Sequence, residues 1–336
     1  MARSRQQLSL FEEILAIPTL RDVADAVRVA GVDGLPDATR RADEARYQHV
    51  QVRSALTPTA GMPFAWALNP YRGCTHACEY CYARKYQRHL ELGTGDDFSS
   101  VILVKTNLPE TLARQVQRQS WTRETVAVGT ATDPYQPIEG HYRLTRRCLE
   151  ILVDAATPFS IVTKGPMVVR DIDVLLRATA GAGCRVYLSV PSVDDEAWAR
   201  LEPGTAHPAQ RLRAARQLAD AGIDTGVLMM PLVPGITTSR DRIRRTVQAI
   251  ADAGVRLTGA NVAHLDDGVR AHFFAFLARE FPSLVDGYER LYRRKYVTAD
   301  YRASVHAVVD DERRRIGGVV RSATAGARRP TTGSAP

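Results

Sequence analysis

Three cysteines lie close together in the run Asn69-Pro70-Tyr71-Arg72-Gly73-Cys74-Thr75-His76-Ala77-Cys78-Glu79-Tyr80-Cys81. Their spacing, Cys-x3-Cys-x2-Cys, places three thiolates on one tight loop. A [4Fe–4S] cluster ordinarily takes four thiolates, so three local ligands leave one iron without a protein ligand. An iron with an open position can bind substrate. The run therefore favours a catalytic cluster over an electron carrier or a structural site.

The other cysteines bear on the alternatives. The chain has five cysteines, and Cys148 and Cys184 lie far from the run. A four-cysteine zinc site would need one of them, and the run lacks the paired Cys-x2-Cys arms usual in zinc modules. Zinc or a fully ligated cluster stays as an alternative. A disulfide framework is not expected in a long, cysteine-poor chain, and free thiols with an oxygen-sensitive cluster indicate a reducing cytoplasm.

Length and charge set further bounds. The 336 residues, 45% of them hydrophobic, allow one large domain with extensions or two smaller domains. The net charge is +8, and residues 287–336 hold eleven Lys or Arg against five Asp or Glu. This basic C-terminal region suits DNA or RNA as a partner, and a solvated basic helix and tail is the alternative. No apolar run approaches the ~18 residues of a membrane span, so no membrane partner is expected.

Short apolar runs alternate with amphipathic segments through the middle of the chain. The runs predict strands at 65–69, 101–105, 125–130, 159–164, 185–190 and 225–230. The amphipathic segments predict helices at 82–92, from 109, and at 144–155, 170–179, 208–221 and 240–253. Apolar strands separated by helices indicate a parallel sheet covered on both faces. Six successive units match right-handed βαβ crossovers.

Polar residues after the strand ends favour a barrel over an open sheet. They include Thr132, Asp133, Lys164 and Ser192. In barrel enzymes the chemistry converges on the rim formed by the carboxyl ends of the strands. The predicted fold is therefore α/β, a partial (β/α)6 TIM-like barrel with N- and C-terminal helical extensions.

The same pattern predicts the domain organisation. The expected parts are an N-terminal helical extension at 1–60, the partial barrel at 61–265, a C-terminal helical basic region at 266–316 and a disordered tail at 317–336. The tail is expected because Gly, Ala, Ser, Thr, Arg and Pro dominate it.

From about residue 61 to residue 296 the chain resembles radical S-adenosylmethionine (SAM) enzymes. The three cysteines, with an aromatic residue before the last one, form the motif of that superfamily. Further runs are similar to its spore-photoproduct-lyase-like, DNA-repair-photolyase-related branch: residues 104–108, 129–139, 163–165, 170–173, 201–204 and 231–235. The resemblance implies an enzyme whose [4Fe–4S] cluster cleaves SAM reductively, so that a radical abstracts a hydrogen atom from an unknown substrate.

The resemblance also implies roles for single residues. Cys74, Cys78 and Cys81 would bind the cluster. Tyr80 resembles the position that contacts the adenine of SAM, with packing beside the cluster as the alternative. Lys164 resembles the position that pairs with the SAM carboxylate.

Five more residues are candidate SAM contacts. Thr132, Asp133 and Glu139 lie in a loop that would receive the amino group of SAM, although Asp133 and the proline after it also form a plain turn signal. Ser189 and Ser192 would reach the ribose hydroxyls, or make only local turn bonds.

One departure from the branch concerns the hydrogen donor. Spore photoproduct lyase uses a further cysteine to donate hydrogen to its substrate radical, and no cysteine lies between Cys81 and Cys148 here. Repair of spore photoproduct is therefore not expected, and Cys148 and Cys184 are expected to be buried structural thiols. The resemblance further implies a one-electron reductant of the flavodoxin or ferredoxin type.

The C-terminal region leaves a second function class open. Tyr288, Tyr292 and Tyr296 recur at four-residue spacing among basic residues, and on a helix they form one stripe. Such a stripe suits a nucleic-acid surface, whereas packing against the barrel is the commoner outcome. A non-catalytic iron–sulfur or zinc protein that binds nucleic acid is thus the alternative to an enzyme.

Overall fold

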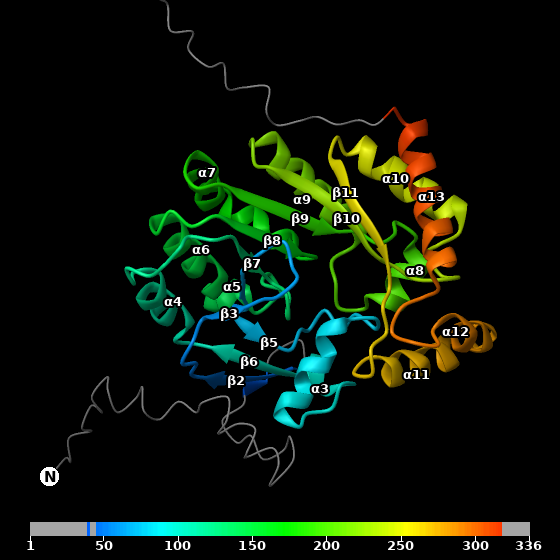
Figure 1. Cartoon of the computed structure of the whole chain (residues 1–336), viewed down its shortest axis with the longest axis horizontal. Helices are drawn as coiled ribbons and strands as arrows, with labels where there is room; N and C mark the ends of the chain where they lie inside the picture. Colours follow the sequence, from blue (N-terminus) through cyan, green and yellow to red (C-terminus); the bar gives the residue numbers. More distant parts are fainter. Residues whose placement is uncertain (1–38, 41–44, 318–336) are drawn as a thin grey trace, which may run out of the picture.

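The computed structural model describes residues 39–40 and 45–317, and a seven-stranded sheet forms its centre (Figure 1). The strand order is β11-β10-β9-β8-β7-β4-β3. All neighbours pair in parallel except β3, which joins β4 antiparallel. The sheet is open, because nothing in the described part pairs β3 with β11. The bounds are β3 (Leu56–Pro58), β4 (Trp66–Leu68), β7 (Val126–Val128), β8 (Phe159–Thr163), β9 (Cys184–Ser189), β10 (Thr225–Leu232) and β11 (Arg256–Val262).

The partial barrel with six parallel strands is confirmed, but one strand was assigned wrongly. Strand β6 (Val101–Lys105) lies in a second sheet, of order β1-β2-β6-β5. The sixth parallel strand is β11, which carries Thr258, Gly259 and Asn261 among its seven residues and is only partly buried. Because β11 has no continuous apolar run, the pattern that revealed the other five strands could not reveal this one.

The predicted N-terminal helical extension is wrong for its described part. Residues 46–50 and 56–58 form strands β2 and β3, and β2 (Arg46–Val50) pairs in parallel with β6. The short strands β1 (Thr39–Arg40) and β5 (Tyr71–Arg72) complete the second sheet. Residues 1–38 and 41–44 lie outside the described residues, as does the predicted tail beyond Gly317.

The predicted barrel helices form near their expected positions, and Figure 1 shows α6, α7, α9 and α10 following one another around the outside of the sheet. Their starts match sequence signals: Pro208 opens α9, and the Ser239 hydroxyl accepts a hydrogen bond from the Arg242 amide at the start of α10. The helices of this part are η2 (Tyr82–Leu90, a 3-10 helix), α3 (Asp97–Ser100), α4 (Leu108–Val116), α5 (Glu139–Tyr142), α6 (Leu144–Asp154), η3 (Pro166–Asp171), α7 (Ile172–Ala180), α8 (Asp195–Leu201), α9 (Pro208–Asp220) and α10 (Arg240–Asp252).

A continuous apolar core joins the sheet to these helices. Leu149 of α6, Ile161 of β8 and Val227 of β10 are all buried in it. Burying one such side chain stabilises the fold by roughly 1.5–3 kcal/mol. Cys148 and Cys184 belong to the same core as free thiols, which is the structural role expected for them.

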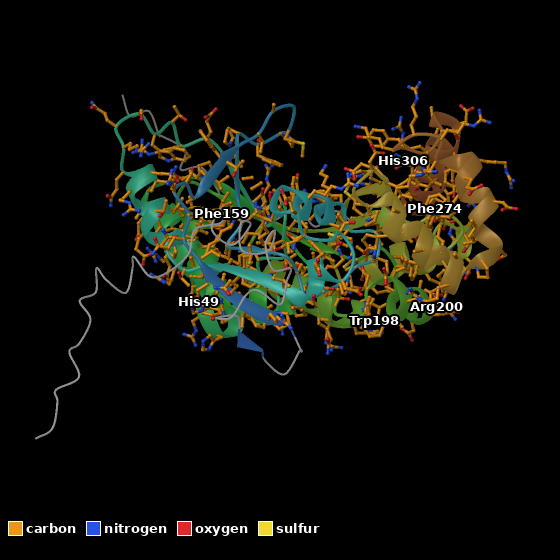
Figure 2. The ribbon with its side chains drawn as sticks, turned by 90° about the horizontal axis from the view of Figure 1, so that it is seen from below. His49, Phe159, Trp198, Arg200, Phe274 and His306 are labelled. Atoms are coloured by element: carbon orange, nitrogen blue, oxygen red, sulfur yellow. The ribbon has the colours of Figure 1, made fainter. Side chains whose placement is uncertain are left out.

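The C-terminal part is helical, as predicted for residues 266–316. It contains α11 (Arg270–Glu280), η4 (Pro282–Leu284), α12 (Val285–Leu291) and α13 (Ala299–Arg315). Helix α13 packs on α10 and β11. In Figure 2, Phe274 and His306 of this part lie on the opposite side of the molecule from His49 of β2. None of the described helices combines the length and the apolar character that a membrane span requires.

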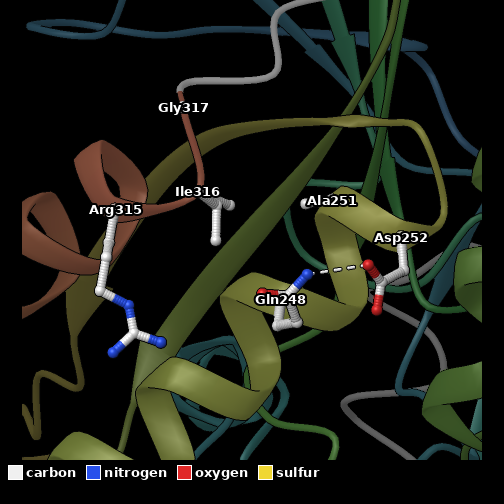
Figure 3. A pocket seen from close by; sticks show the side chains of 6 residues that line it. All are labelled: Gln248, Ala251, Asp252, Arg315, Ile316 and Gly317. Atoms are coloured by element: carbon white, nitrogen blue, oxygen red, sulfur yellow. Dashed lines mark hydrogen bonds between the residues drawn. The ribbon is translucent and has the colours of Figure 1, made fainter.

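A surface depression lies between α10 and the end of α13 (Figure 3). Gln248, Asp252, Arg315 and Ile316 are among the residues that line it, and the Gln248 amide donates a hydrogen bond of 2.8 Å to the Asp252 carboxylate. None of the predicted site residues lines this depression.

Candidate metal and cofactor site

The cysteine run forms a loop between β5 and η2. Cys74 and Cys78 are buried, Cys81 is half-buried, and all three are free thiols. Burial raises the pKa of Cys74 well above its ordinary value, with the Asp133 carboxylate as the next cause. Burial likewise raises the pKa of Cys78, to about 12. Thiolates in such surroundings need a strong positive charge nearby, which a metal centre supplies.

The backbone of the loop is held by a buried arginine. The Arg84 guanidinium of η2 donates hydrogen bonds to the carbonyl oxygens of Ala77 at 3.0 Å and Cys78 at 3.1 Å. Gly73 precedes the first cysteine with a left-handed φ of 83°, and a Cβ there would overlap the carbonyl oxygen of Val101. The cysteines are therefore presented by a rigid loop, as a preformed metal site requires.

The donor set fits an iron–sulfur cluster better than a single metal ion. In a cubane each thiolate binds a different iron, so the sulfur atoms need not converge on one point. A structural zinc ion needs four ligands around one point. Within residues 39–40 and 45–317, no three Cys, His, Asp or Glu side chains are placed to hold one ion. Three thiols on one loop thus suit separate irons of one cluster.

The loop after β7 lies directly against the cysteine loop. The Thr132 hydroxyl donates to the Gly73 carbonyl oxygen at 2.6 Å, and the Gln136 amide donates to the same hydroxyl at 2.9 Å. The Thr75 backbone N–H donates to the Gln136 side-chain oxygen at 3.1 Å. Thr132 thus lies beside the first cysteine, where its side chain supports the loop.

Asp133 connects three segments of the site. Its carboxylate accepts hydrogen bonds from the Thr163 hydroxyl at 2.5 Å and the Lys164 backbone N–H at 2.7 Å. The His76 ring of the cysteine loop lies 3.3 Å from the same carboxylate. Burial alone would raise the pKa of Asp133, but the His76 ring and these hydrogen bonds outweigh it and lower the pKa to about 2. His76 is itself buried within the loop.

Lys164 is half-buried and belongs to a group of otherwise buried charges next to Cys78. Its ammonium lies 3.8 Å from the Glu202 carboxylate and 5.6 Å from the centre of the Tyr80 ring. The Tyr80 hydroxyl donates a hydrogen bond to Glu202, whose other oxygen lies 2.6 Å from the Arg211 guanidinium. Burial would lower the pKa of Lys164, but Cys78 and Glu202 raise it above its ordinary value. Lys164 is therefore a cation at neutral pH.

Sequence reasoning missed Glu202 and Arg211. Glu202 follows α8 and Arg211 lies inside α9, positions where charged residues usually face solvent. The run at 201–204 carries part of the family resemblance, which implies no role for Glu202. In the structure, Gly204 donates its N–H to the His76 carbonyl oxygen at 3.2 Å, and a Cβ there would overlap the Thr75 carbonyl oxygen. The glycine permits this segment to approach the cysteine loop closely.

The two serines lie at the end of β9 with local partners. The Ser189 hydroxyl donates to the Met230 carbonyl oxygen at 2.9 Å, and its backbone oxygen accepts from Arg211 at 3.0 Å. The Ser192 hydroxyl accepts from the Asp194 N–H at 3.1 Å. Ser189 is thereby linked to the buried charges, whereas Ser192 makes the local turn bond named as its alternative.

Glu139 does not belong to this site, which corrects its assignment as a SAM contact. Its carboxylate is fully buried and has four hydrogen-bond donors. They are the Tyr71 hydroxyl, the backbone N–H groups of Thr145 and Arg146, and the Arg170 guanidinium. Four donors occupy the lone pairs of a carboxylate, so none remains for the amino group of a ligand.

The sequence model of one protein family matches residues 68–250, which is more than half of the chain, and its description is "Radical SAM superfamily". The chain belongs to the radical SAM superfamily. The Mycobacterium bovis protein Mb2609c is 38% identical over 266 residues, which cover 77% of this chain and 78% of that protein. The radical SAM Nα-GlyT isomerase of Pseudomonas phage M6 is 30% identical over 186 residues, which cover 55% of this chain and 36% of that one.

Solved structures agree on the fold. A spore photoproduct lyase double mutant with bound AdoMet and dinucleoside spore photoproduct superposes with a TM-score of 0.64 at 18% identity, over 90% of this chain and 93% of that chain. This likeness confirms the radical SAM type of partial barrel. The chain is thus an enzyme of this superfamily, which implies a [4Fe–4S] cluster, SAM and an external reductant. The non-catalytic alternative gains no support.

Replacing Glu139 by Gln should destabilise the fold by about 1–3 kcal/mol, because the amide nitrogen of Gln cannot accept a hydrogen bond and leaves buried donors of Tyr71, Thr145 or Arg146 unpaired. Glu150→Gln is the matched control, since Glu150 pairs with Arg146 in a more exposed place and should cost at most about 1 kcal/mol. Chemical denaturation measures both. Full stability of Glu139→Gln together with weakened SAM binding would restore Glu139 as a SAM contact.

The depressed pKa of Asp133 predicts a pH-dependent contribution to stability. A carboxyl whose folded pKa is about 2, against an ordinary 3.8, stabilises the fold fully above pH 3.8 and loses this contribution as pH falls through 2. The contribution is about 2 kcal/mol. The free energy of unfolding should therefore fall more steeply between pH 4 and 2 in the wild type than in Asp133→Asn. The exposed-site variant Asp267→Asn should follow the wild type, and parallel curves for all three would contradict the prediction.

Proposed function

We propose that the chain holds a [4Fe–4S] cluster through Cys74, Cys78 and Cys81, and SAM beside it through the polar residues at the strand ends. The observation that carries this proposal is the set of three thiols, two buried and one half-buried, on one loop that contacts Thr132 and Asp133 after β7. Asp133 in turn accepts a hydrogen bond from the Lys164 backbone at the end of β8. When bound, the cluster supplies the electron that cleaves SAM to methionine and a 5′-deoxyadenosyl radical, which abstracts a hydrogen atom from substrate.

Lys164 is the residue we propose for the SAM carboxylate. Glu202 lies closer to Arg211, at 2.6 Å, than to Lys164, at 3.8 Å. Because one carboxylate faces two cations, the group keeps one positive charge in excess. A buried excess charge is costly unless an anion compensates it, and the carboxylate of SAM is such an anion.

The remaining candidates fall into two groups. Thr132 and Asp133 are engaged with the cysteine loop, so we propose that they hold the cluster ligands in place and that any contact with SAM is secondary. Tyr80 contacts both Lys164 and Glu202. Ser189 ends β9 and Ser192 follows it closely. We propose that these three residues shape the wall against which the adenosyl group lies.

The substrate proposed here is nucleic acid. A matched solved structure, that of a spore photoproduct lyase, holds a dinucleoside spore photoproduct, and a dinucleoside is a fragment of nucleic acid. The phage M6 relative is named a radical SAM Nα-GlyT isomerase. Repair of spore photoproduct is not proposed for this chain, because Cys148 is fully buried in the core and cannot face a substrate radical. The proposed electron source is a reductant of the flavodoxin or ferredoxin type.

Anaerobic reconstitution should give about four irons per chain, as one cubane requires. With SAM and dithionite the reconstituted protein should then form 5′-deoxyadenosine, measured by chromatography. Cys81→Ala should lose both iron and product, because it removes one cluster ligand. Cys184→Ala, which removes a buried thiol outside the loop, should keep both. A preparation with full iron and sulfide that forms no 5′-deoxyadenosine would contradict the proposed function.

Lys164→Met should weaken SAM binding by about 10- to 100-fold, the usual range for losing a charge-assisted hydrogen bond. Methionine keeps an apolar stem of similar length, so the packing against Tyr80 is retained. Isothermal titration of SAM into the reconstituted protein measures the loss. Arg213→Met, at an exposed cation on α9, is the charge-matched control and should bind SAM as the wild type does. Equal affinity of Lys164→Met and the wild type would remove Lys164 from the SAM site.

A further inference from the structure

Three aromatic rings from distant parts of the chain form a row at the edge of the site. Tyr82 opens η2, His264 follows β11, and Tyr296 precedes α13. The ring centres of Tyr82 and His264 are 5.7 Å apart, as are those of His264 and Tyr296. We call these three residues the aromatic row.

The row begins at the candidate cofactor site. Tyr82 directly follows the third cysteine of the motif, and its hydroxyl donates a hydrogen bond to the Thr130 carbonyl oxygen in the loop after β7. His264 lies two residues beyond the end of β11, on the same rim of strand ends. The row therefore leads from the cysteine loop outward along the C-terminal part.

Packing does not account for the row. Tyr82 is 38% exposed and Tyr296 is 50% exposed, and they are two of the five large apolar side chains that the described residues leave exposed. The neighbouring Tyr288 and Tyr292 are buried, and their hydroxyls donate to the carbonyl oxygens of Pro234 and Ala263. The tyrosine stripe is thus divided: two members pack on the barrel and the third faces solvent.

Positive charge surrounds the outer end of the row. The Lys295 ammonium lies 4.9 Å from the centre of the Tyr296 ring. Arg293, Arg294 and Lys295 are all exposed, and none forms an ion pair with another described residue. At the inner end Lys85 is neutralised by Asp266 at 3.0 Å. Uncompensated cations beside an exposed ring provide an anion-binding surface next to a stacking surface.

We propose that the aromatic row is the stacking surface for an unpaired base of a nucleic-acid strand, whose phosphates contact Arg293, Arg294 and Lys295. This inference rests on the proposed function and extends it by naming the surface that binds the nucleic-acid substrate. Bases offer flat π faces and the backbone offers regular negative charge, and proteins that bind single strands combine rings with cations in this way. A duplex keeps its bases stacked inside, so a single strand or an extruded base fits the row better.

The test is fluorescence anisotropy with a labelled mixed-sequence oligonucleotide, titrated anaerobically with the reconstituted full chain. Single-stranded DNA and RNA should bind more tightly than the duplex of the same sequence. Tyr296→Leu should weaken binding by about 5- to 100-fold, the range for losing one stacked base, whereas Tyr296→Phe should bind as the wild type does. Lys295→Ala should lower the slope of log affinity against log salt by about 0.7, as expected for one phosphate contact.

Two matched controls lie on the outer helices. Leu176→Ala removes an exposed apolar side chain of α7, and Arg213→Ala removes an exposed cation of α9, so both should bind as the wild type does. Iron content and melting temperature show that each variant is folded. Wild-type affinity of Tyr296→Leu, or displacement of the oligonucleotide by polyglutamate of equal charge, would overturn the proposal. Failure of the proposed function would be recognised by a different result from failure of this inference, because the wild-type protein would then form no 5′-deoxyadenosine.

Discussion

The buried carboxylate of Asp133 is the interaction on which the arrangement of the site depends. A single charged group accepts hydrogen bonds from the end of β8 and faces the His76 ring in the cysteine loop. A buried carboxylate is stable only when such partners surround it, so the three segments are fixed relative to one another. The cysteines therefore take their position from the strand ends, and the backbone of Lys164 is placed by the same carboxylate.

A second constraint is the charge balance around Glu202. Without Glu202, the Lys164 and Arg211 cations would lie buried near each other with nothing to compensate them. With Glu202, the group has one excess positive charge, which suits its proposed place beside the cysteine thiolates and the carboxylate of SAM. Tyr80 joins the same group through its hydroxyl, so the aromatic position of the cysteine motif is held by the residues that hold Lys164.

The fold was predictable wherever burial leaves a continuous apolar run, as in β8 and β9. It was not predictable for β11, whose Thr, Gly and Asn residues interrupt that signal. Nor was it predictable for β2, whose residues are mostly polar, or for β3, which has only three residues. The cysteine loop was recognisable because the spacing of its three cysteines is local. Glu202 and Arg211 were not, because a buried ion pair depends on tertiary proximity and each residue alone resembles a surface charge. Glu139 was misassigned for the same reason: its four donors come from segments that only the fold brings together.

The position of the aromatic row bears on how one scaffold directs a reactive species to a substrate. A radical formed beside the cysteines must meet its substrate before it meets water or protein, which requires the substrate to be held at that edge of the barrel. Tyr82 is adjacent to Cys81 in sequence, so whatever stacks on its ring is held within one residue of a proposed cluster ligand. The C-terminal part contributes Tyr296 and the free cations, whereas the barrel contributes the cysteines and Lys164. Changes confined to the C-terminal part could therefore alter the substrate while leaving the formation of the radical intact.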